Sequence, residues 1–174
     1  NGRCCRHRLL TAADVMAHSL VVISATANDH KLTEMSAAFG DAVVLLARPA
    51  DVPEVVEDAG TFVGNARLKA AAIAEASGQV ALADDSGLEV DALGGAPGVE
   101  SAYYSGGDHD DAANRKRLMA ELIGTPEGGR TARFRTVMVL CWPDGTEVVA
   151  EGTCEGSIGL VERGDQGFGY DSLF

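Results

Sequence analysis

Residues 81–88 of the sequence read Ala-Leu-Ala-Asp-Asp-Ser-Gly-Leu, an apolar run that leads into two adjacent carboxylates, Asp84 and Asp85. Asp is depleted in strands, so the pattern predicts a strand that ends at a Ser-Gly turn near Ser86. Two carboxylates about 4 Å apart repel each other by about 4 kcal/mol at a protein's effective dielectric constant. We therefore expect that one of them is protonated or that both share a cation, and oxygen ligands favour Mg²⁺. The alternative is an ordinary turn at the end of a strand.

A polar run upstream lies between a predicted strand and a predicted helix. Residues 20–25 are continuously apolar, as in a strand buried on both faces, and apolar residues recur at helical spacing over 32–39. Asn28 or Asp29 can cap the helix, and the N–H groups there can bind a phosphate. A capped helix with Lys31 facing solvent is the plainer interpretation. The run also contains Thr26.

A second helix is predicted over residues 61–77, with its first residue, a threonine, as the N-cap. Asn65 and Lys69 are four residues apart, so they lie on one face of this helix and can present an amide and an ammonium group together. Two acids, Glu57 and Asp58, precede the helix. Ordinary surface polarity is the alternative for each of these residues when it is considered alone.

The remaining elements decide the fold class. A further strand is predicted over 42–47 and a helix over 110–122, and residues 133–142 and 147–156 flank a Pro-Asp-Gly turn in the manner of a hairpin. Helices and strands that alternate first and form a hairpin later predict an α/β fold. We expect a mixed twisted central sheet with flanking helices, and two lobes with a substrate cleft between them.

Composition limits the classes of partner. With 174 residues the chain has the size of one domain, and its net charge of −12 argues against a nucleic-acid polymer or an anionic membrane as partner. It contains no apolar run long enough for a transmembrane helix. The four cysteines show no paired spacing, so we expect neither a zinc site nor a disulfide framework, and a reducing cytoplasm. Residues 1–17 are predicted to be a disordered or artefactual extension, and residues 18–174 the domain.

Four motifs follow one another at characteristic separations. They are Thr26-x-Asn28-x-x-Lys31; Glu57 and Asp58 ahead of Thr61-Phe62-x-x-Asn65-Ala66-x-x-Lys69; Ala83-Asp84-Asp85-Ser86-Gly87-Leu88 with the loop Leu93-Gly94-Gly95-x-Pro97-Gly98; and Gly167-Phe168-Gly169-Tyr170-Asp171. Together they resemble the inosine triphosphate pyrophosphatase family, which removes non-standard purine nucleotides from the nucleotide pool. The resemblance covers residues 21–174, and the third motif with its loop is the most specific part.

The resemblance implies a hydrolase of a family whose members are commonly homodimers. Family members cleave purine nucleoside triphosphates such as ITP, dITP and XTP between the α- and β-phosphates with Mg²⁺, and release the monophosphate and pyrophosphate. By the same resemblance, Asp85 is the general base and a metal ligand, and Asp84 supports Asp85 in binding the metal. Glu57 is a further metal ligand, and Asp58 is the alternative candidate for that role. Such chemistry depends mainly on positioning and charge neutralisation.

The resemblance also implies substrate-binding residues. The triphosphate is expected to bind Thr26, Asn28, Lys31, Lys69 and Ser86. The purine base is expected to bind the segment Phe168, Gly169, Tyr170 and Asp171, with the Phe ring stacked on the base. Donors that face the 6-oxo group would select against the 6-amino group of adenine, because they would be left unpaired.

The chain departs from the family pattern in three places. Ala27 replaces a glycine, and Gly64 stands where the family often has an acid. The family continues past the last motif to a lysine, a Ser-His-Arg motif and a C-terminal helix, so we expect a C-terminally truncated domain, with Val137 and Val139 exposed, lower stability and weaker base selectivity. Two alternatives remain: a nucleotide-binding chain with little or no catalysis, and a metal-dependent phosphatase that releases orthophosphate.

Overall fold

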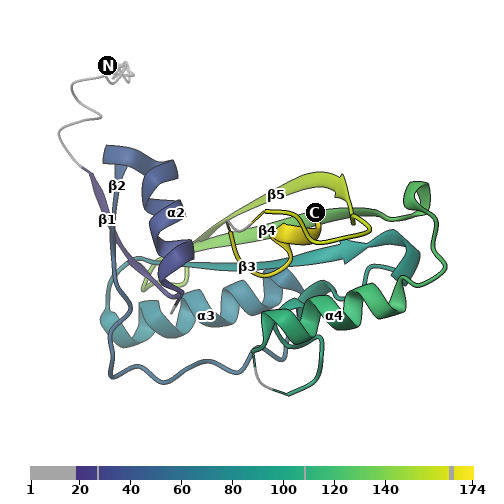
Figure 1. Cartoon of the computed structure of the whole chain (residues 1–174). Coiled ribbons are helices and arrows are strands. Elements are labelled where there is room, and N and C mark those ends of the chain that lie inside the picture. The colour runs from purple at the N-terminus through teal and green to yellow at the C-terminus, as the bar shows by residue number, and fades with distance from the viewer. Residues whose placement is uncertain (1–18, 27, 108, 165–166) are drawn as a thin grey trace, which may run out of the picture.

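The computed structural model describes residues 19–26, 28–107, 109–164 and 167–174, so the predicted extension and Ala27 lie outside the described residues. The described residues form a sheet of five strands in the order β2-β1-β3-β4-β5 (Figure 1). β1 pairs in parallel with β2 and β3, whereas β4 pairs antiparallel with β3 and β5, which confirms the mixed sheet. The strands are β1 (Leu20–Ser24), β2 (Val43–Leu46), β3 (Ala81–Val90), β4 (Thr131–Cys141) and β5 (Glu147–Ser157).

The helices begin where the sequence places their caps. The side chain of Asn28 accepts hydrogen bonds from the first-turn N–H groups of α2, and Thr61 does the same for α3. Gly78 ends α3 in the left-handed conformation, at φ 65°. The helices are α2 (Asp29–Phe39), α3 (Phe62–Ser77) and α4 (Asp111–Glu121).

Helices α2 and α3 cover opposite faces of the sheet (Figure 1). Side chains alternate along a strand, so Leu82 of β3 packs against Met35 of α2, while Ala83 packs against Ile73 of α3. Further along the α2 face, Leu88 packs against α4 and the C-terminal residues. One face of β3 therefore has an apolar cluster at each end and polar residues between the two clusters.

The exposed apolar residues are not those expected from the sequence. Val137 and Val139 are fully buried because α3 packs on β4, so the expectation that they are exposed is wrong. The exposed apolar residues are spread over other elements, from Val21 of β1 (47% exposed) and Val44 of β2 (43%) to Val148 of β5 (56%) and Ile123 after α4 (81%). Within the run 20–25, Leu20 and Val21 are exposed and residues 22–25 are buried, so the expected burial on both faces of the strand holds from Val22 onward.

The predicted turn at Ser86 is also wrong, because β3 continues to Val90. Ser86 and Gly87 pair with Thr136 and Arg135 of β4, which supplies hydrogen bonds to this polar part of the strand. Gly87 has a steric role, since a Cβ there would lie 2.3 Å from the carbonyl oxygen of Gly98 and 2.6 Å from Ser101 Oγ. The absence of a side chain lets the segment after the Gly-Gly loop lie against β3.

Gly87→Ala is expected to lower the free energy of unfolding by about 3 kcal/mol, because the new methyl group overlaps a backbone carbonyl that cannot move freely. Urea unfolding measures this change. Gly152→Ala in β5 is the matched control, since a Cβ there meets nothing within 4 Å. Equal urea midpoints for the two variants would contradict the steric role of Gly87.

Candidate active site

An open pocket of about 990 Å³ lies along β3. β1 pairs with β3 only at Ala81 and Leu82, so the edge of β3 beyond this point has no parallel neighbour in the described sheet. Side chains from both faces of β3 therefore border one pocket. It is lined by all twelve residues predicted for the site, namely Thr26, Asn28, Lys31, Glu57, Lys69, Asp84, Asp85, Ser86, Phe168, Gly169, Tyr170 and Asp171.

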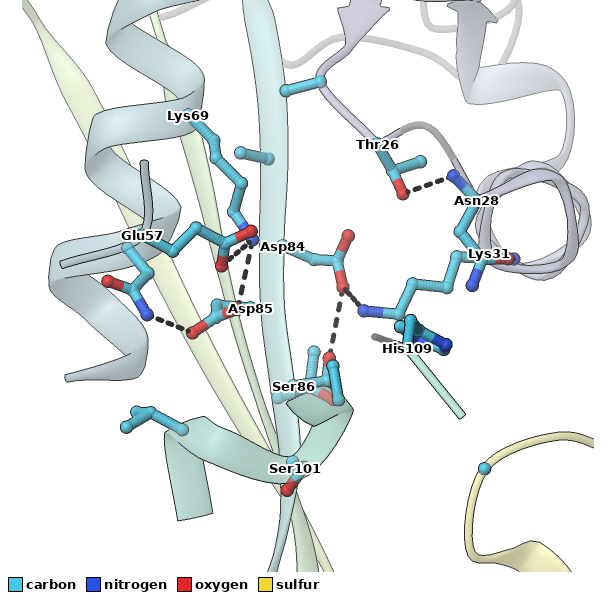
Figure 2. A pocket seen from close by; sticks show the side chains of 18 of the residues that line it. Thr26, Asn28, Lys31, Glu57, Lys69, Asp84, Asp85, Ser86, Ser101 and His109 are labelled. Carbon is cyan, nitrogen blue, oxygen red and sulfur yellow. Dashed lines mark hydrogen bonds and ion pairs between the residues drawn. The ribbon is translucent and has the colours of Figure 1, made fainter. Parts of the chain in front are cut away.

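The two adjacent aspartates point to opposite faces of the sheet (Figure 2). Lys31 Nζ of α2 lies 2.6 Å from Asp84 Oδ2, and Lys69 Nζ of α3 lies 3.1 Å from Asp85 Oδ1. The expectation that the pair repels unless it shares a proton or an ion is thus corrected: the alternation of the strand separates the carboxylates, and each has its own lysine.

Helix α3 shapes the surroundings of Asp85. Asn65 Nδ2 donates to Asp85 Oδ2 at 3.2 Å, one helical turn before Lys69, as expected for residues on one helix face. Lys69 Nζ also lies 2.9 Å from Glu57 Oε2. Of the two acids that precede α3, Glu57 forms this ion pair, and Asp58 also lines the pocket. One ammonium group is thus shared by two carboxylates.

Burial is the main influence on the protonation of Asp85, and Lys69 and Glu57 modify it. Burial raises the pKa of Asp85 to about 6, against the opposing effect of Lys69 and with a further increase from Glu57. Burial lowers the pKa of Lys69, but the two carboxylates outweigh it and raise that pKa overall. Lys69 therefore stays charged, and the site keeps an excess of negative charge around Asp85.

The phosphate-binding candidates are engaged with one another. Asn28 Oδ1 accepts from the N–H of Lys31 at 3.2 Å, and Thr26 Oγ1 accepts from the N–H of Asn28 at 3.1 Å. Ser86 Oγ donates to Asp84 Oδ2 at 3.1 Å and lies 3.0 Å from Thr136 Oγ1. These contacts order the first loop of α2 beside Asp84 (Figure 2).

The base-binding candidates divide into two kinds. The hydroxyl of Tyr170 donates to the carbonyl oxygen of Ser101 at 2.9 Å, and Asp171 Oδ2 accepts from the N–H of Phe168 at 2.9 Å, so both side chains hold the segment in shape. The Phe168 ring instead faces His30 of α2, with ring centroids 6.1 Å apart and planes at 24°. The segment thus reaches the helix that carries the first motif.

Comparisons with known proteins agree with this geometry. Residues 22–174 match the model of the Ham1 family. The chain belongs to the Ham1 family. Two relatives are both named dITP/XTP pyrophosphatase. The one from Nitratidesulfovibrio vulgaris is 51% identical to this chain, and the one from Lactiplantibacillus plantarum is 47% identical to it. The matches cover 88% of this chain and 78% of the first relative, and 91% of this chain and 80% of the second.

Solved Ham1 structures share the fold. A HAM1 protein from Coxiella burnetii superposes with a TM-score of 0.81 at 36% identity, over 89% of this chain and 81% of that one. A second structure is that of a nucleoside-triphosphatase from Mycobacterium abscessus, also named dITP/XTP pyrophosphatase. It superposes with a TM-score of 0.75 at 40% identity, over 89% of this chain and 83% of that one. These matches confirm the family resemblance seen in the sequence and the mixed α/β fold.

The Ham1 site has the donors that a hard divalent cation prefers, since Glu57, Asp84 and Asp85 offer oxygen ligands and Asp85 lacks full charge compensation. Within the described ranges, no three His, Cys, Asp or Glu side chains lie together as a ready ligand set. Lys31 and Lys69 occupy carboxylate oxygens that an ion would share. The donor chemistry therefore fits a cation, provided that the ammonium groups shift towards a bound anion.

Sequence reasoning missed several residues of this Ham1 pocket. Thr136, His109 and Asp111 line it, and His30 faces Phe168. Except for His30, which stands in the first polar run, they belong to none of the four motifs, so the sequence held no pattern that could single them out. In the part of the chain that the structure describes, no helix has the length and apolar character to cross a membrane.

The two aspartates predict opposite responses of stability to substitution. Folding raises the pKa of Asp85 from 3.8 to about 6, so the folded state loses stability as the pH rises through this window. In the metal-free protein, Asp85→Asn is expected to add about 2 kcal/mol to the free energy of unfolding at pH 7 and almost nothing at pH 4. Urea unfolding with a chelator present, at several pH values, measures the difference.

Asp84→Asn is the matched control from the neighbouring position. It removes the partner of Lys31, whose ion pair with Asp84 lies largely out of water, so we expect a loss of about 2 kcal/mol at pH 7. A loss of stability for Asp85→Asn at pH 7 as large as that for Asp84→Asn would contradict the charge balance described for Asp85.

Proposed function

We propose that this Ham1 chain hydrolyses non-standard purine nucleoside triphosphates (ITP, dITP and XTP) to the monophosphate and pyrophosphate, with Mg²⁺ as cofactor. The observation that carries the proposal is the meeting of Lys31, Lys69 and an Asp85 carboxylate of raised pKa in one pocket. The names of the relatives support the substrate class. A cytoplasmic location, which the cysteine pattern indicates, and a homodimer, which the family resemblance implies, stay predictions.

The residues divide the work of the reaction. Asp85 accepts a proton from the attacking water, for which a pKa of about 6 suits a base that works near neutral pH. Lys31 and Lys69 release their carboxylate partners in part and bind phosphate oxygens as point charges. Asn65 holds Asp85 by its second oxygen. When bound, Mg²⁺ supplies charge neutralisation of the phosphates, and Glu57, Asp84 and Asp85 are the residues that would hold it.

We also propose that the substrate binds in a cleft between two lobes. α2 and its apolar cluster would form one wall, and α4 with the C-terminal residues would form the other, because the two clusters lie at opposite ends of one face of β3. The triphosphate would lie on the polar residues between them, with its phosphates towards Lys31 and its base towards Phe168. Lys31 and Phe168 both line the same pocket.

The test is hydrolysis of dITP by the purified chain with Mg²⁺, with the products separated by ion exchange. The proposal requires one pyrophosphate for each dIMP and a higher kcat/KM for dITP and XTP than for dATP. Orthophosphate as the product would support the metal-dependent phosphatase instead. Binding of dITP without turnover would support the alternative of a nucleotide-binding chain with little or no catalysis.

A further inference from the structure

Helix α4 holds the backbone of Gly169, in the base-binding segment, from two sides. Asp111 Oδ2 accepts a hydrogen bond from the N–H of Gly169 at 2.9 Å, and Arg115 Nη1 donates to the carbonyl oxygen of Gly169 at 2.8 Å. Asp111 and Arg115 are four residues apart, so they project from the same face of α4. Both polar groups of Gly169 are thus bound by charged side chains, which form stronger hydrogen bonds than neutral ones.

Helix α4 is itself firmly anchored. Leu118 is fully buried against β3, and the buried Asn114 side chain donates to the carbonyl oxygen of Ala102 at 2.8 Å and accepts from the N–H of Ser105 at 2.7 Å. Asp110 caps the first turn. Asp111 and Arg115 therefore project from a rigid element, and rigid elements position a site more accurately than loops do.

The two hydrogen bonds between α4 and Gly169 help to determine the position of the neighbouring Phe168 ring. Gly169 has a φ of +58°, a conformation that fixes the direction of the chain on either side of it. Phe168 precedes it directly, and its ring lies in the pocket against His30 of α2. The Tyr170 hydroxyl and the Asp171 carboxylate tie the segment down independently. Loss of one α4 contact would therefore tilt the Phe168 ring while the segment stays attached.

We infer that Asp111 and Arg115 are positioning residues for the purine base, and that they act through the backbone of Gly169 on the Phe168 ring. The inference rests on the proposed function, since it needs a nucleotide whose base stacks on Phe168. A displacement of about 1 Å is enough to weaken such a contact strongly. The triphosphate end of the pocket, at Lys31 and Lys69, is held by other elements and is expected to stay intact.

The experiment separates the base from the phosphates. The dissociation constants of dITP, measured with its uncleavable α,β-methylene analogue, and of pyrophosphate, which has no base, are determined by calorimetry on the full chain with Mg²⁺ present. Asp111→Ala and Arg115→Met are each expected to weaken dITP binding about tenfold, the effect of one hydrogen bond to a charged group. Pyrophosphate binding is expected to change less than twofold.

Two further variants make the test specific. Asp111→Asn keeps an oxygen that can accept from Gly169, so it is expected to recover most of the dITP affinity. Glu162→Gln removes the ion pair of Arg115 Nε with Glu162 Oε2 at 3.1 Å but leaves the bond to Gly169, so dITP affinity is expected to stay within twofold of that of the unaltered chain.

The outcomes are distinguishable. Parallel weakening of dITP and pyrophosphate would show a general structural role and overturn the inference, as would unchanged dITP affinity in Asp111→Ala and Arg115→Met. If the unaltered chain binds dITP but releases no pyrophosphate with Mg²⁺, the proposed function fails, while a selective loss of dITP binding in the variants still supports the inference. No measurable binding of dITP by the unaltered chain would overturn both.

Discussion

Asp85→Asn is expected to lower kcat for dITP hydrolysis about a thousandfold, because an amide cannot take the proton from the attacking water and binds a cation poorly. The side chain keeps its size, and Asn65 and Lys69 keep partners in the remaining amide oxygen and Glu57. The folded structure should therefore survive. Release of pyrophosphate from dITP, followed with an excess of Mg²⁺, measures the effect.

Asp58→Asn is the matched control for this prediction. Asp58 lines the same pocket and carries the same charge, but Glu57 forms the ion pair with Lys69. We expect kcat for this variant to stay within about threefold of that of the unaltered chain, as for a substitution that removes only a long-range charge effect. Equal rates of pyrophosphate release by Asp85→Asn and the unaltered chain would remove Asp85 from the role of general base.

Removal of divalent cations is expected to abolish hydrolysis of dITP, with a fall in rate of at least about a thousandfold. The triphosphate brings several negative charges to a pocket where Asp85 already lacks full compensation, and Lys31 and Lys69 cannot neutralise both substrate and carboxylates. The measurement compares the rate with EDTA and the rate after Mg²⁺ is added back in excess.

EDTA that has been saturated with Mg²⁺ beforehand serves as the control for a direct effect of the chelator. Thermal unfolding with and without EDTA shows whether the metal-free chain remains folded over the assay. Hydrolysis at the same rate in EDTA and in Mg²⁺ would exclude the metal-dependent mechanism proposed for this pocket, and with it the metal roles of Glu57, Asp84 and Asp85.

Much of the fold could be predicted from local features of the sequence. The caps at Asn28 and Thr61 were found because short polar side chains stand directly before a helical apolar pattern. The hairpin of β4 and β5 was found because its turn residues separate two strand-like runs. In both cases the residues that decide the structure lie within a few positions of one another.

The errors arose where distant segments decide the structure. The strand beyond Ser86 is stabilised by β4, which lies 50 residues further along the chain. Val137 and Val139 are buried by α3, which is separated from them in the sequence by β3 and α4. The sequence around each of these residues does not indicate which distant segment packs against it. Local propensity therefore predicted a turn at Ser86 and exposed valines, and both predictions are wrong.

The same distinction applies to the site. Its predicted residues meet in one pocket because the four motifs stand at the ends or on the inner faces of elements that border β3. The pairing of Lys31 with Asp84 and of Lys69 with Asp85 follows only from the alternation of faces along β3, with one helix on each side. Asp111 and Arg115 were not singled out, because their link to Gly169 spans 58 and 54 positions.

The alternation along β3 also limits how this part of the chain can change in length. Deleting or inserting one residue between Ala81 and Asp84 would turn the first carboxylate towards α3 and the second towards α2, and would exchange their lysines. Gly87 would at the same time leave the position beside the carbonyl oxygen of Gly98, where a Cβ would lie only 2.3 Å away. We therefore expect insertions and deletions among homologues to fall outside residues 81–88, even where individual side chains differ.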